Sequence, residues 1–175
     1  MEKISLMHIE TLLGVMVACA TQQGLCMLEF TDRKKIDWQI VSLKTILQNN
    51  NIVEDETPIL TALKCEMAEY FAGKRQQFSV PLHFAGTNFQ KKVWTALLQI
   101  PFGETTSYMQ LAETIGDGAK YVRAVANANA ANKIAIVVPC HRVIGSDGSL
   151  TGYAGGLHRK NWLLNHEDSK QKLFL

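Results

Sequence analysis

The amino-acid sequence predicts two small domains: an α/β domain over residues 1–80 and a mainly helical domain over residues 88–175, joined by a linker at residues 81–87. Two β-like runs followed by two helical patterns indicate the first domain, and a series of helical patterns indicates the second. A proline and a glycine punctuate the segment between them. The 175 residues suffice for one domain or two, and contents of 47% hydrophobic and 19% charged residues are typical of a globular chain.

The first predicted element is a β-hairpin. Residues 12–20 form an apolar run, residues 21–24 interrupt it, and residues 25–30 resume it. The first run faintly resembles a signal peptide, but Glu2 and Glu10 precede it, so the basic segment of a signal peptide is lacking. No later stretch is long enough to span a membrane. We therefore expect a cytoplasmic protein.

Two helices follow in the first domain. A helix is predicted near residues 35–49, and a loop follows over residues 50–57. A second helix is predicted from Pro58 to Phe71, because proline suits the first helical turn and Thr57 is a suitable N-cap. This half carries no recognisable chemistry.

The second domain is predicted to contain three helices. They cover residues 88–100, 107–115 and 119–131. Residues 101–103, Pro-Phe-Gly, end the first, and residues 116–118, Gly-Asp-Gly, form a tight turn between the others. Helix, short glycine turn and helix make up the outline of a helix-turn-helix, although many helical proteins share that pattern.

The last of these helices carries an unusual run of small residues. After Arg123, residues 124–132 read Ala-Val-Ala-Asn-Ala-Asn-Ala-Ala-Asn. Close helix packing is one explanation, because alanine is common where helices approach each other. Close approach to DNA is the other, because the minor groove is only ~6 Å wide and tolerates little side-chain bulk.

Positive charge is concentrated in the second half of the chain. Residues 1–87 hold 8 Lys or Arg and 10 Asp or Glu, whereas residues 88–175 hold 10 and 6. Between residues 120 and 160 a single acid, Asp147, stands against six basic residues: Lys120, Arg123, Lys133, Arg142, Arg159 and Lys160. Such a cluster suits a phosphate backbone, and a solvated surface with a chance excess is the alternative.

The pentapeptide Pro139–Val143, Pro-Cys-His-Arg-Val, is the most informative motif. Five apolar and mostly β-branched residues, 134–138, precede it and predict a buried strand that Pro139 ends. A thiol, Cys140, and an imidazole, His141, would then stand at the end of a rigid element. A buried cysteine is usually only a small hydrophobe, so the pair alone leaves catalysis and packing both open.

The motif resembles the active-site sequence of the O6-alkylguanine-DNA alkyltransferases, the methylated-DNA–protein-cysteine methyltransferases. The resemblance continues upstream into residues 106–112, Thr-Ser-Tyr-Met-Gln-Leu-Ala, and residues 123–125, Arg-Ala-Val. Downstream it covers residues 152–156, Gly-Tyr-Ala-Gly-Gly, and residues 162–167, Trp-Leu-Leu-Asn-His-Glu. Several independent motifs therefore agree in order and spacing.

The resemblance implies a ribonuclease-H-like α/β first domain and a second domain with a winged-helix-like helix-turn-helix. It implies repair of double-stranded DNA by irreversible, single-turnover transfer of an alkyl group from O6-alkylguanine to Cys140, with O4-alkylthymine left open as a further substrate. The base would be flipped out of the duplex. The resemblance further implies a monomer that needs no cofactor.

It also implies the catalytic residues. Attack on a saturated carbon suits a thiolate, and a free thiol with a pKa of about 8.5 needs a base to form one at neutral pH. Cys140 would be the nucleophile and His141 the base, acting through a water, while Glu167 would hold the imidazole in the right tautomer. Tyr108 would donate a proton to ring N3 of the departing guanine.

Further residues would bind DNA. Arg123 matches the family's arginine finger, which takes the place of the flipped nucleotide. Asn132 matches an asparagine that ties the recognition helix to the turn bearing the cysteine, and Lys133 stands where the family usually has proline, so its charge could meet a phosphate. The other DNA contacts implied by position are Gln90, Met109, Asn129 and Ser146.

The pocket for the flipped base is implied as well. Tyr153 would stack on the base, the Ala154 N–H would face O6, and Gly155 would complete the wall. The backbone carbonyls of Cys140 and Val143 would accept the guanine amino group.

Three alternatives remain open at this stage. Some alkyltransferases carry a structural zinc, for which His8, Cys19, Cys26 and His83 could be recruited, but their spacing does not demand it, and free thiols in a reducing compartment are the simpler interpretation. The chain could bind lesions without repairing them, although Cys140 argues against that. It could also be another thiol enzyme such as a peptidase, which would not need Arg123 and the small-residue helix.

Overall fold

The computed structural model describes residues 2–116 and 118–168. The chain divides into two compact units. The first contains residues up to 86 together with residues 133–137, and the second contains residues 87–132 and the chain from residue 138 onward. A short segment just before Cys140 therefore belongs to the first unit, although it lies far along the sequence.

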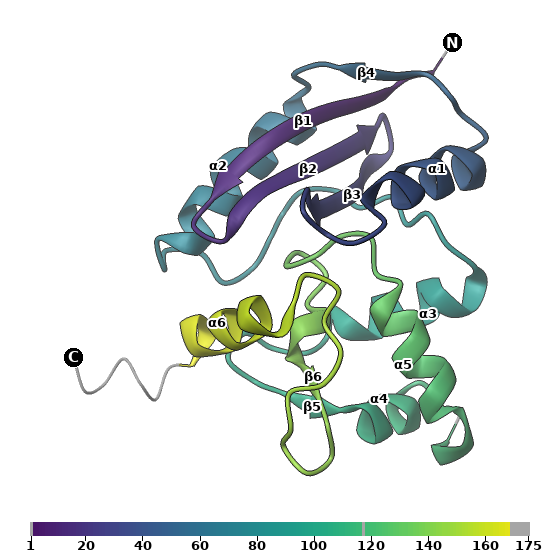
Figure 1. Ribbon diagram of the computed structural model, residues 1–175, viewed down its shortest axis with the longest axis vertical. Helices are drawn as coiled ribbons and strands as arrows, with labels where there is room; N and C mark the ends of the chain where they lie inside the picture. The colour runs from purple at the N-terminus through teal and green to yellow at the C-terminus, as the bar shows by residue number, and fades with distance from the viewer. Residues whose placement is uncertain (1, 117, 169–175) are drawn as a thin grey trace. The chain divides into compact units, whose positions relative to one another are not determined.

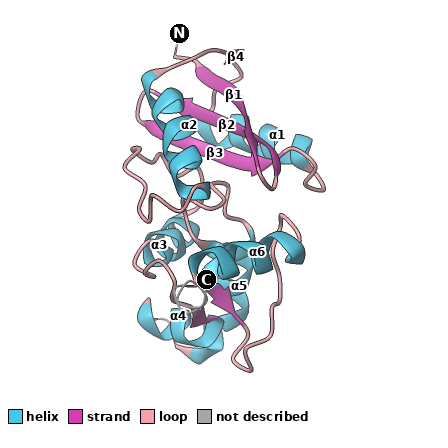
Figure 2. Ribbon diagram, turned by 90° about the vertical axis from the view of Figure 1, so that its left-hand side faces the viewer, coloured by secondary structure: helices cyan, strands magenta, loops and turns pink. Residues whose placement is uncertain are grey.

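The first unit is a four-stranded sheet with helices on both faces (Figures 1 and 2). The strand order is β3-β2-β1-β4; the first three strands are antiparallel neighbours and β4 is parallel to β1. Every residue of β3 is buried, as both covered faces require. The elements are β1 (Ile4–Thr11), β2 (Gly14–Thr21), β3 (Gly24–Phe30), α1 (Ile36–Leu47), β4 (Ile52–Glu54) and α2 (Pro58–Phe71).

Local signals predicted most of these elements. The hairpin of β2 and β3 is confirmed, with Gln22 and Gln23 between the strands. The α2 helix has the predicted bounds, and the Thr57 side chain accepts a hydrogen bond from the Leu60 N–H, as an N-cap does. The loop predicted over residues 50–57 was wrong in part, because residues 52–54 pair with β1. A strand of three residues is too short to show the alternation of apolar and polar side chains by which strands are predicted.

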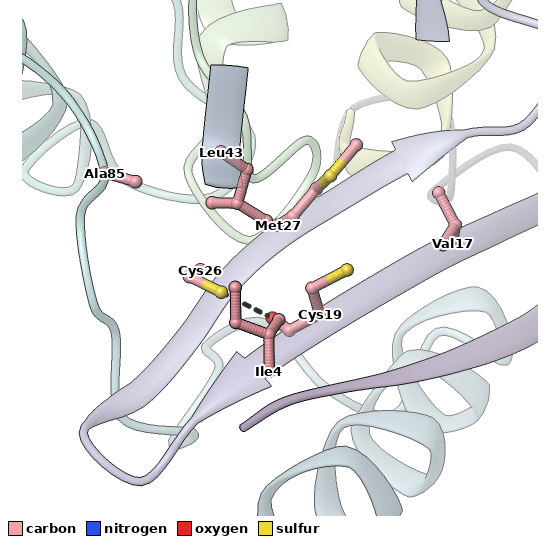
Figure 3. Close-up of a cluster of buried hydrophobic side chains, with 7 residues drawn as sticks. All are labelled: Ile4, Val17, Cys19, Cys26, Met27, Leu43 and Ala85. Atoms are coloured by element: carbon pink, nitrogen blue, oxygen red, sulfur yellow. Dashed lines mark hydrogen bonds between the residues drawn. The ribbon is translucent and has the colours of Figure 1, made fainter. Parts of the chain in front are cut away.

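The core beneath α1 includes both N-terminal cysteines (Figure 3). Cys26 Sγ donates a hydrogen bond to the Cys19 carbonyl over 3.2 Å, and burial raises the pKa of Cys19 to about 12. Burial also raises the pKa of Cys26. These thiols are thus packing groups. No group of three or more His, Cys, Asp or Glu that could hold a metal occurs among the described residues, and His83 Nδ1 lies 2.8 Å from the Thr21 hydroxyl.

Two distant segments cover the outer edge of β3. Leu25 bonds through its N–H to the Pro81 carbonyl and through its carbonyl to the His83 N–H, each over 2.8 Å. The expected linker at residues 81–87 is therefore bound to β3 over part of its length. Further along β3, Leu28 bonds in the same way to Lys133 and Ala135, again over 2.8 Å. Because the backbone N–H and C=O groups of Leu25 and Leu28 are already hydrogen-bonded, this part of the edge is not available for pairing with a strand of another chain.

The strand predicted over residues 134–138 was wrong. Only Ile134 makes a β-bridge, to Leu28, and the chain then turns. The Val137 N–H bonds to the Ala135 carbonyl over 2.8 Å, and Ile136 between them has φ 70, which makes a γ-turn with positive φ. Positive φ is unusual for a β-branched residue. The apolar run correctly indicates that residues 134–138 are buried. It does not indicate whether their backbone is extended.

The second unit consists mainly of helices around a two-stranded parallel sheet, β5 with β6. Its elements are α3 (Asn88–Leu97), β5 (Thr106–Ser107), α4 (Tyr108–Thr114), η1 (Ala119–Tyr121), α5 (Val122–Ala130), η2 (Cys140–Arg142), β6 (Val143–Ile144) and α6 (Leu157–Glu167). The α3 and α4 helices begin with capping boxes, Thr87 with Gln90 and Ser107 with Gln110. These helices are confirmed, with ends shifted by one to three residues.

The turn predicted at residues 116–118 includes Asp117, which lies outside the described residues. Gly116 and Gly118 on either side have φ values of 82 and 69. No helix in the described part of the chain has the length and apolar character that crossing a membrane requires.

We expect Gly24→Ala to destabilise the protein because Gly24 has φ 153 and an added Cβ would lie 2.6 Å from the Pro81 carbonyl oxygen. That atom belongs to backbone already bound to Leu25, so it cannot move freely. A loss of about 2–3 kcal/mol in the free energy of unfolding is expected in urea denaturation.

Gly148→Ala is the matched control. Gly148 has φ 82, but nothing lies within 4 Å of an added Cβ, so only the backbone penalty of about 1 kcal/mol applies. Equal losses in the two variants would contradict the close approach at Gly24.

Candidate active site

Cys140 is the first residue of η2, directly after a tight turn at Pro139. The Cys140 N–H bonds to the Val138 carbonyl over 2.8 Å, and Pro139 has φ −82 and ψ 61, an inverse γ-turn. After η2 the chain enters β6, where Val143 and Ile144 pair with Thr106 and Ser107 of β5. Because α4 begins immediately after β5, this pairing brings its first residue, Tyr108, toward the cysteine segment. Cys140 itself is buried, with 7% of its surface exposed.

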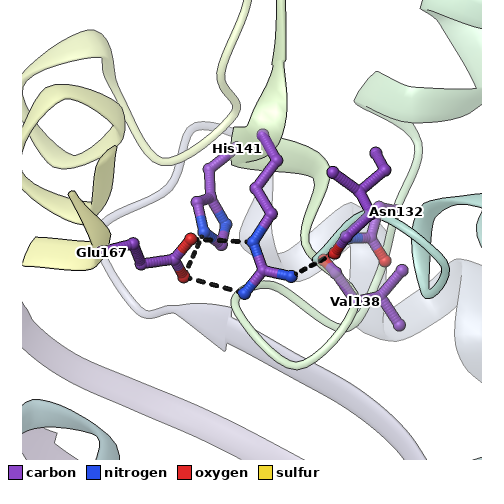
Figure 4. A network of polar contacts seen from close by, with 6 residues as sticks. Asn132, Val138, His141 and Glu167 are labelled. Carbon is purple, nitrogen blue, oxygen red and sulfur yellow. Dashed lines mark hydrogen bonds and ion pairs between the residues drawn. The ribbon is translucent and has the colours of Figure 1, made fainter. Parts of the chain in front are cut away.

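His141 and Glu167 form a buried pair (Figure 4). His141 Nε2 lies 2.9 Å from Glu167 Oε1, and both side chains are essentially unexposed. An ionised carboxylate can only accept, so Nε2 carries the proton and Nδ1 has a free lone pair. Nδ1 is buried and has no hydrogen-bond partner among the residues that the structure describes. The imidazole can therefore accept a proton at Nδ1.

Arg142 holds the same carboxylate from the other side. Its Nε donates to Glu167 Oε2 over 2.7 Å, its Nη2 donates to Oε1 over 3.0 Å, and its Nη1 donates to the Ile100 carbonyl over 2.6 Å. This bidentate geometry is specific to a planar guanidinium. It connects η2 with α6 and with the chain that follows α3.

These contacts determine the protonation states. Burial would raise the pKa of Glu167, but the hydrogen bonds and charges of His141 and Arg142 outweigh burial and hold that pKa well below its ordinary range. Burial lowers the pKa of His141 below its ordinary 6.5, although the bond to Glu167 opposes the shift. The carboxylate is therefore ionised and the imidazole neutral, as a general base must be.

Tyr108 lies beside the loop that precedes α6. Its hydroxyl donates to the Thr151 carbonyl over 2.9 Å, and burial raises its pKa. Gly152, the next residue, has φ 62, and a Cβ there would lie 3.6 Å from the Tyr108 hydroxyl. The glycine thus allows the loop to turn close to the tyrosine.

The expected pocket wall is an irregular loop before α6, and two basic side chains of α6 donate hydrogen bonds to its backbone. Arg159 Nη1 donates to the Gly155 carbonyl over 3.0 Å, and Lys160 Nζ donates to the Val143 carbonyl over 2.5 Å. Val143 and Gly155 are buried, Tyr153 is half-buried and Ala154 is exposed. The Val143 carbonyl, expected to bind guanine, thus already accepts one donor and retains a second lone pair.

Asn132, expected to tie the recognition helix to the turn bearing the cysteine, and Asn129, expected to contact DNA, are both buried. Asn132 Nδ2 donates to the Val138 carbonyl over 2.9 Å, and Asn129 Nδ2 lies 3.5 Å from the Cys140 carbonyl. Both residues are at most 4% exposed. The tie expected between Asn132 and the turn bearing the cysteine is therefore confirmed, and the Asn129 amide is directed to the same segment rather than to DNA.

The other residues assigned to DNA are accessible to different degrees. Arg123, Met109 and Ser146 are exposed, and Met109 lies in the first turn of α4. Gln90 is half-buried, and its side chain accepts from the Thr87 N–H over 2.9 Å as part of the α3 capping box. Gln90 therefore has a local role in addition to any contact with DNA.

The predicted cluster of positive charge is wrong as a description of the surface. Of its six basic residues, four are at most 7% exposed: Lys133, Arg142, Arg159 and Lys160. Lys133 cannot meet a phosphate, because its side chain is buried where Arg33 and Glu29 act on its charge, and burial lowers its pKa. Only Lys120 and Arg123 of this set are exposed. A sequence counts charges but does not reveal which are buried.

Comparison with known proteins identifies the family. Residues 88–169 match the family model described as 6-O-methylguanine DNA methyltransferase, DNA binding domain, and residues 6–84 match the model for the ribonuclease-like domain of the same proteins. The chain belongs to the 6-O-methylguanine DNA methyltransferase family. The family excludes the peptidase alternative.

Relatives support the assignment over nearly the whole chain. This family member is 44% identical to the constitutive methylated-DNA–protein-cysteine methyltransferase of Bacillus subtilis, over 90% of this chain and 92% of the relative. It is 42% identical to the enzyme of Methanosarcina barkeri, over 92% and 95%. A crystal structure of the Mycobacterium tuberculosis protein in complex with DNA matches with a TM-score of 0.81 at 35% identity, covering 98% and 99% of the two chains.

Sequence reasoning missed two residues of this methyltransferase site, Arg142 and Lys160. Arg142 directly follows His141 and was counted only as a charge. Lys160 lies on the same helical face as Leu163 and Glu167, three and seven positions later, and all three are buried. From that spacing, the burial of the Lys160 side chain could have been predicted.

We expect the stability of this family member to fall as pH drops below about 6.5. The folded protein binds a proton at His141 less readily than the unfolded chain does, since the pKa of His141 is lowered on folding. Unfolding therefore takes up a proton, and stability is lost as the pH falls through the unfolded pKa. Glu167, whose pKa is also lowered, adds a further loss below about pH 4.3.

The measurement is urea denaturation at several pH values from about 7.5 to about 5.5. His141→Gln should flatten the pH dependence in this range. His8→Gln makes the same substitution at an exposed histidine and is measured beside it as the matched control. A wild-type stability that is constant over the range would contradict the lowered pKa.

Proposed function

We propose that this chain repairs DNA by transferring the alkyl group of O6-alkylguanine to Sγ of Cys140, once per molecule. The observation that carries the proposal is the buried His141–Glu167 pair next to Cys140 in the chain, with His141 neutral and its Nδ1 without a hydrogen-bond partner in the described part of the chain. A base in this state suits activation of a thiol, directly or through a water. The activity of the matched relatives supports the same reaction.

In the first step of the proposed reaction, the Cys140 proton passes to His141 Nδ1, and the imidazolium that forms is stabilised by the ionised Glu167. The thiolate attacks the alkyl carbon, the S–C bond forms, and the C–O6 bond breaks with its electron pair moving to the guanine. Tyr108 donates its proton to ring N3 of the departing base. The thioether has no easy route back to a thiol, so the protein reacts once.

The proposed DNA interface is a helix-turn-helix made of α4, the following turn and α5, in a winged-helix-like arrangement. Arg123 and Asn127 are exposed on α5, one helical turn apart, and Ala130 follows on the exposed side, so the surface of this helix is nearly flat beyond the arginine. Such a surface suits the minor groove. Arg123 would enter the duplex as the base flips out. Met109, Ser146 and Gln90 are proposed to contact the phosphate backbone.

We propose that residues 1–80 brace the catalytic half, residues 88–175. We also propose that the protein acts as a monomer, without a cofactor, on double-stranded DNA. The pocket for the base would be formed by Val143, Tyr153, Ala154 and Gly155. None of the four cysteines is in a disulfide, which suits a reducing compartment, and we propose the cytoplasm.

Mass spectrometry of the intact protein tests the reaction. After incubation with excess duplex containing O6-methylguanine, the protein should gain one methyl group per chain and then stop, because the thioether does not turn over. Cys140→Ala should gain none. Cys65→Ala removes an exposed cysteine on α2 and should gain one methyl group, like the wild type. Continued turnover, or methylation of Cys140→Ala, would refute the proposal.

Arg123→Ala should slow the repair of duplex DNA far more than the reaction with the free base O6-benzylguanine. If Arg123 fills the gap left by the flipped nucleotide, it lowers a cost that exists only in a stacked duplex. Each ~1.4 kcal/mol lost would reduce the flipped population roughly tenfold.

Single-turnover rates on both substrates decide the matter. Lys120→Ala, which removes the other exposed cation near the start of α5, should have a small effect on duplex repair that fades at high salt. Equal losses on both substrates in Arg123→Ala would show that Arg123 supports the fold, and the arginine-finger assignment would then be dropped.

A further inference from the structure

The outer edge of β1 is covered over only part of its length. β4 pairs with residues 4–6, and the Asp55 N–H adds a last hydrogen bond to the Leu6 carbonyl over 3.1 Å. Beyond Leu6, no segment in the described part of the chain pairs with this edge. At the opposite side of the sheet, by contrast, the edge of β3 is bound at Leu25 and Leu28.

The backbone groups of His8 and Glu10 are directed to this uncovered edge. The Ile4 N–H donates over 2.8 Å to the residue before β4, and the Leu6 carbonyl accepts from the residue after β4, so Ile4 and Leu6 direct their backbone groups to the β4 side. The direction alternates along a strand, so His8 and Glu10 share it. Two N–H donors and two carbonyl acceptors are thus without a backbone partner among the described residues.

A groove runs along the uncovered edge, where α2 lies beside β1 (Figures 1 and 2). Its volume is about 710 Å³, and its lining includes Ile9 of β1 together with Met67 and Phe71 of α2. Leu12, which is 75% exposed, lies at its rim. A second hollow of about 440 Å³ adjoins the groove at His8. The edge therefore has room beside it for an extended segment with an apolar side chain.

The two faces of the sheet differ in charge along this edge. Side chains of directly paired residues lie on the same face. Leu6 pairs with Cys19 and with Glu54, and Leu6 and Cys19 pack in the core beneath α1. Glu54 and Glu10 therefore lie on the α1 side, and both are exposed. An added strand would meet apolar side chains on the α2 side, where Ile9 lies, and carboxylates on the α1 side.

We propose that the uncovered edge of β1 is a docking site for an extended, basic segment of a partner protein. The segment pairs antiparallel with β1, because an antiparallel strand satisfies His8 and Glu10 in two hydrogen-bonded pairs. An apolar side chain of the segment enters the groove beside Met67, and its basic side chains lie next to Glu10 and Glu54. This charge complementarity selects a basic partner. The proposal does not depend on the alkyl transfer proposed above.

The probe that tests the proposal is the capped, fluorescently labelled peptide Lys-Val-Lys-Phe-Lys-Val-Lys, whose basic and apolar side chains alternate between two faces. Binding to the full chain is measured by fluorescence anisotropy. When the phenylalanine lies opposite Ile9, the two central lysines lie opposite His8 and Glu10 and direct their N–H groups to β1. Methylation of these two nitrogens should weaken binding at least about tenfold. Methylation of the two valine nitrogens, which face away from β1, should change binding less than about threefold.

Glu10→Lys tests the charge complementarity. The side chain is exposed, so the fold should tolerate the substitution. The variant should bind the lysine peptide about three- to fivefold more weakly at low salt. A peptide with glutamates in place of the lysines should bind the variant more tightly than it binds the wild type. Glu104→Lys makes the same substitution at an exposed acid of the second unit, and it should bind both peptides as the wild type does.

Amide hydrogen exchange shows where the peptide binds. The N–H groups of His8 and Glu10 should exchange at least about tenfold more slowly in the complex. The proposal is overturned if the peptide does not bind the wild type, if methylation of the lysine nitrogens has no effect, or if only other amides are protected. His8 and Glu10 would then be polar side chains that keep the edge unpaired. Self-association of the wild type through the same two amides would also overturn it, because the edge would then belong to a second copy of the chain.

Discussion

The buried carboxylate of Glu167 is the group on which the geometry of the second unit depends. It accepts from His141 and Arg142, and Arg142 continues to the carbonyl of Ile100. A buried ion pair adds little net stability compared with apolar packing. Its value here is geometrical, since one ionised carboxylate fixes the tautomer of the imidazole, the position of η2 and the end of α6. The imidazole after Cys140 is thereby held in a defined orientation, with its unprotonated nitrogen at Nδ1.

Three basic side chains of the second unit are buried. Arg142, Arg159 and Lys160 each bind backbone carbonyls, and the segments that they bind are loops or very short elements. Loops have few backbone partners of their own, so a buried cation can supply the donors that a sheet or helix would supply elsewhere. The wall of the proposed pocket is thus hydrogen-bonded to α6 without regular secondary structure of its own. Lys91, Lys92, Lys120 and Arg123 of this unit are exposed.

Sequence reasoning was accurate where the cause of the structure is local. Thr57 with Pro58, and Ser107 with Gln110, identify helix starts because the capping interaction occurs within one turn. Sequence reasoning failed where a structure depends on contacts with residues far away in the sequence. Residues 134–138 look like a strand, but they turn at Ile136, and the inward direction of Lys160 depends on carbonyls from two other segments. Cys140, His141 and Glu167 were found through the family resemblance, because no spacing in a sequence brings residue 167 to residue 141.

The assignment of residues 133–137 to the first unit has a consequence for synthesis of the chain. β3 is complete at residue 30, and residues 81–83 cover one part of its outer edge soon afterwards. The partner of Leu28 arrives only when residues 133–135 emerge from the ribosome, about a hundred residues later at ~5–20 residues per second. Until then the nascent first unit has an uncovered edge at Leu28, and the turn ahead of the cysteine finds that edge already formed when it emerges. The last step in building the first unit and the first step in shaping the nucleophile's turn are thus one event.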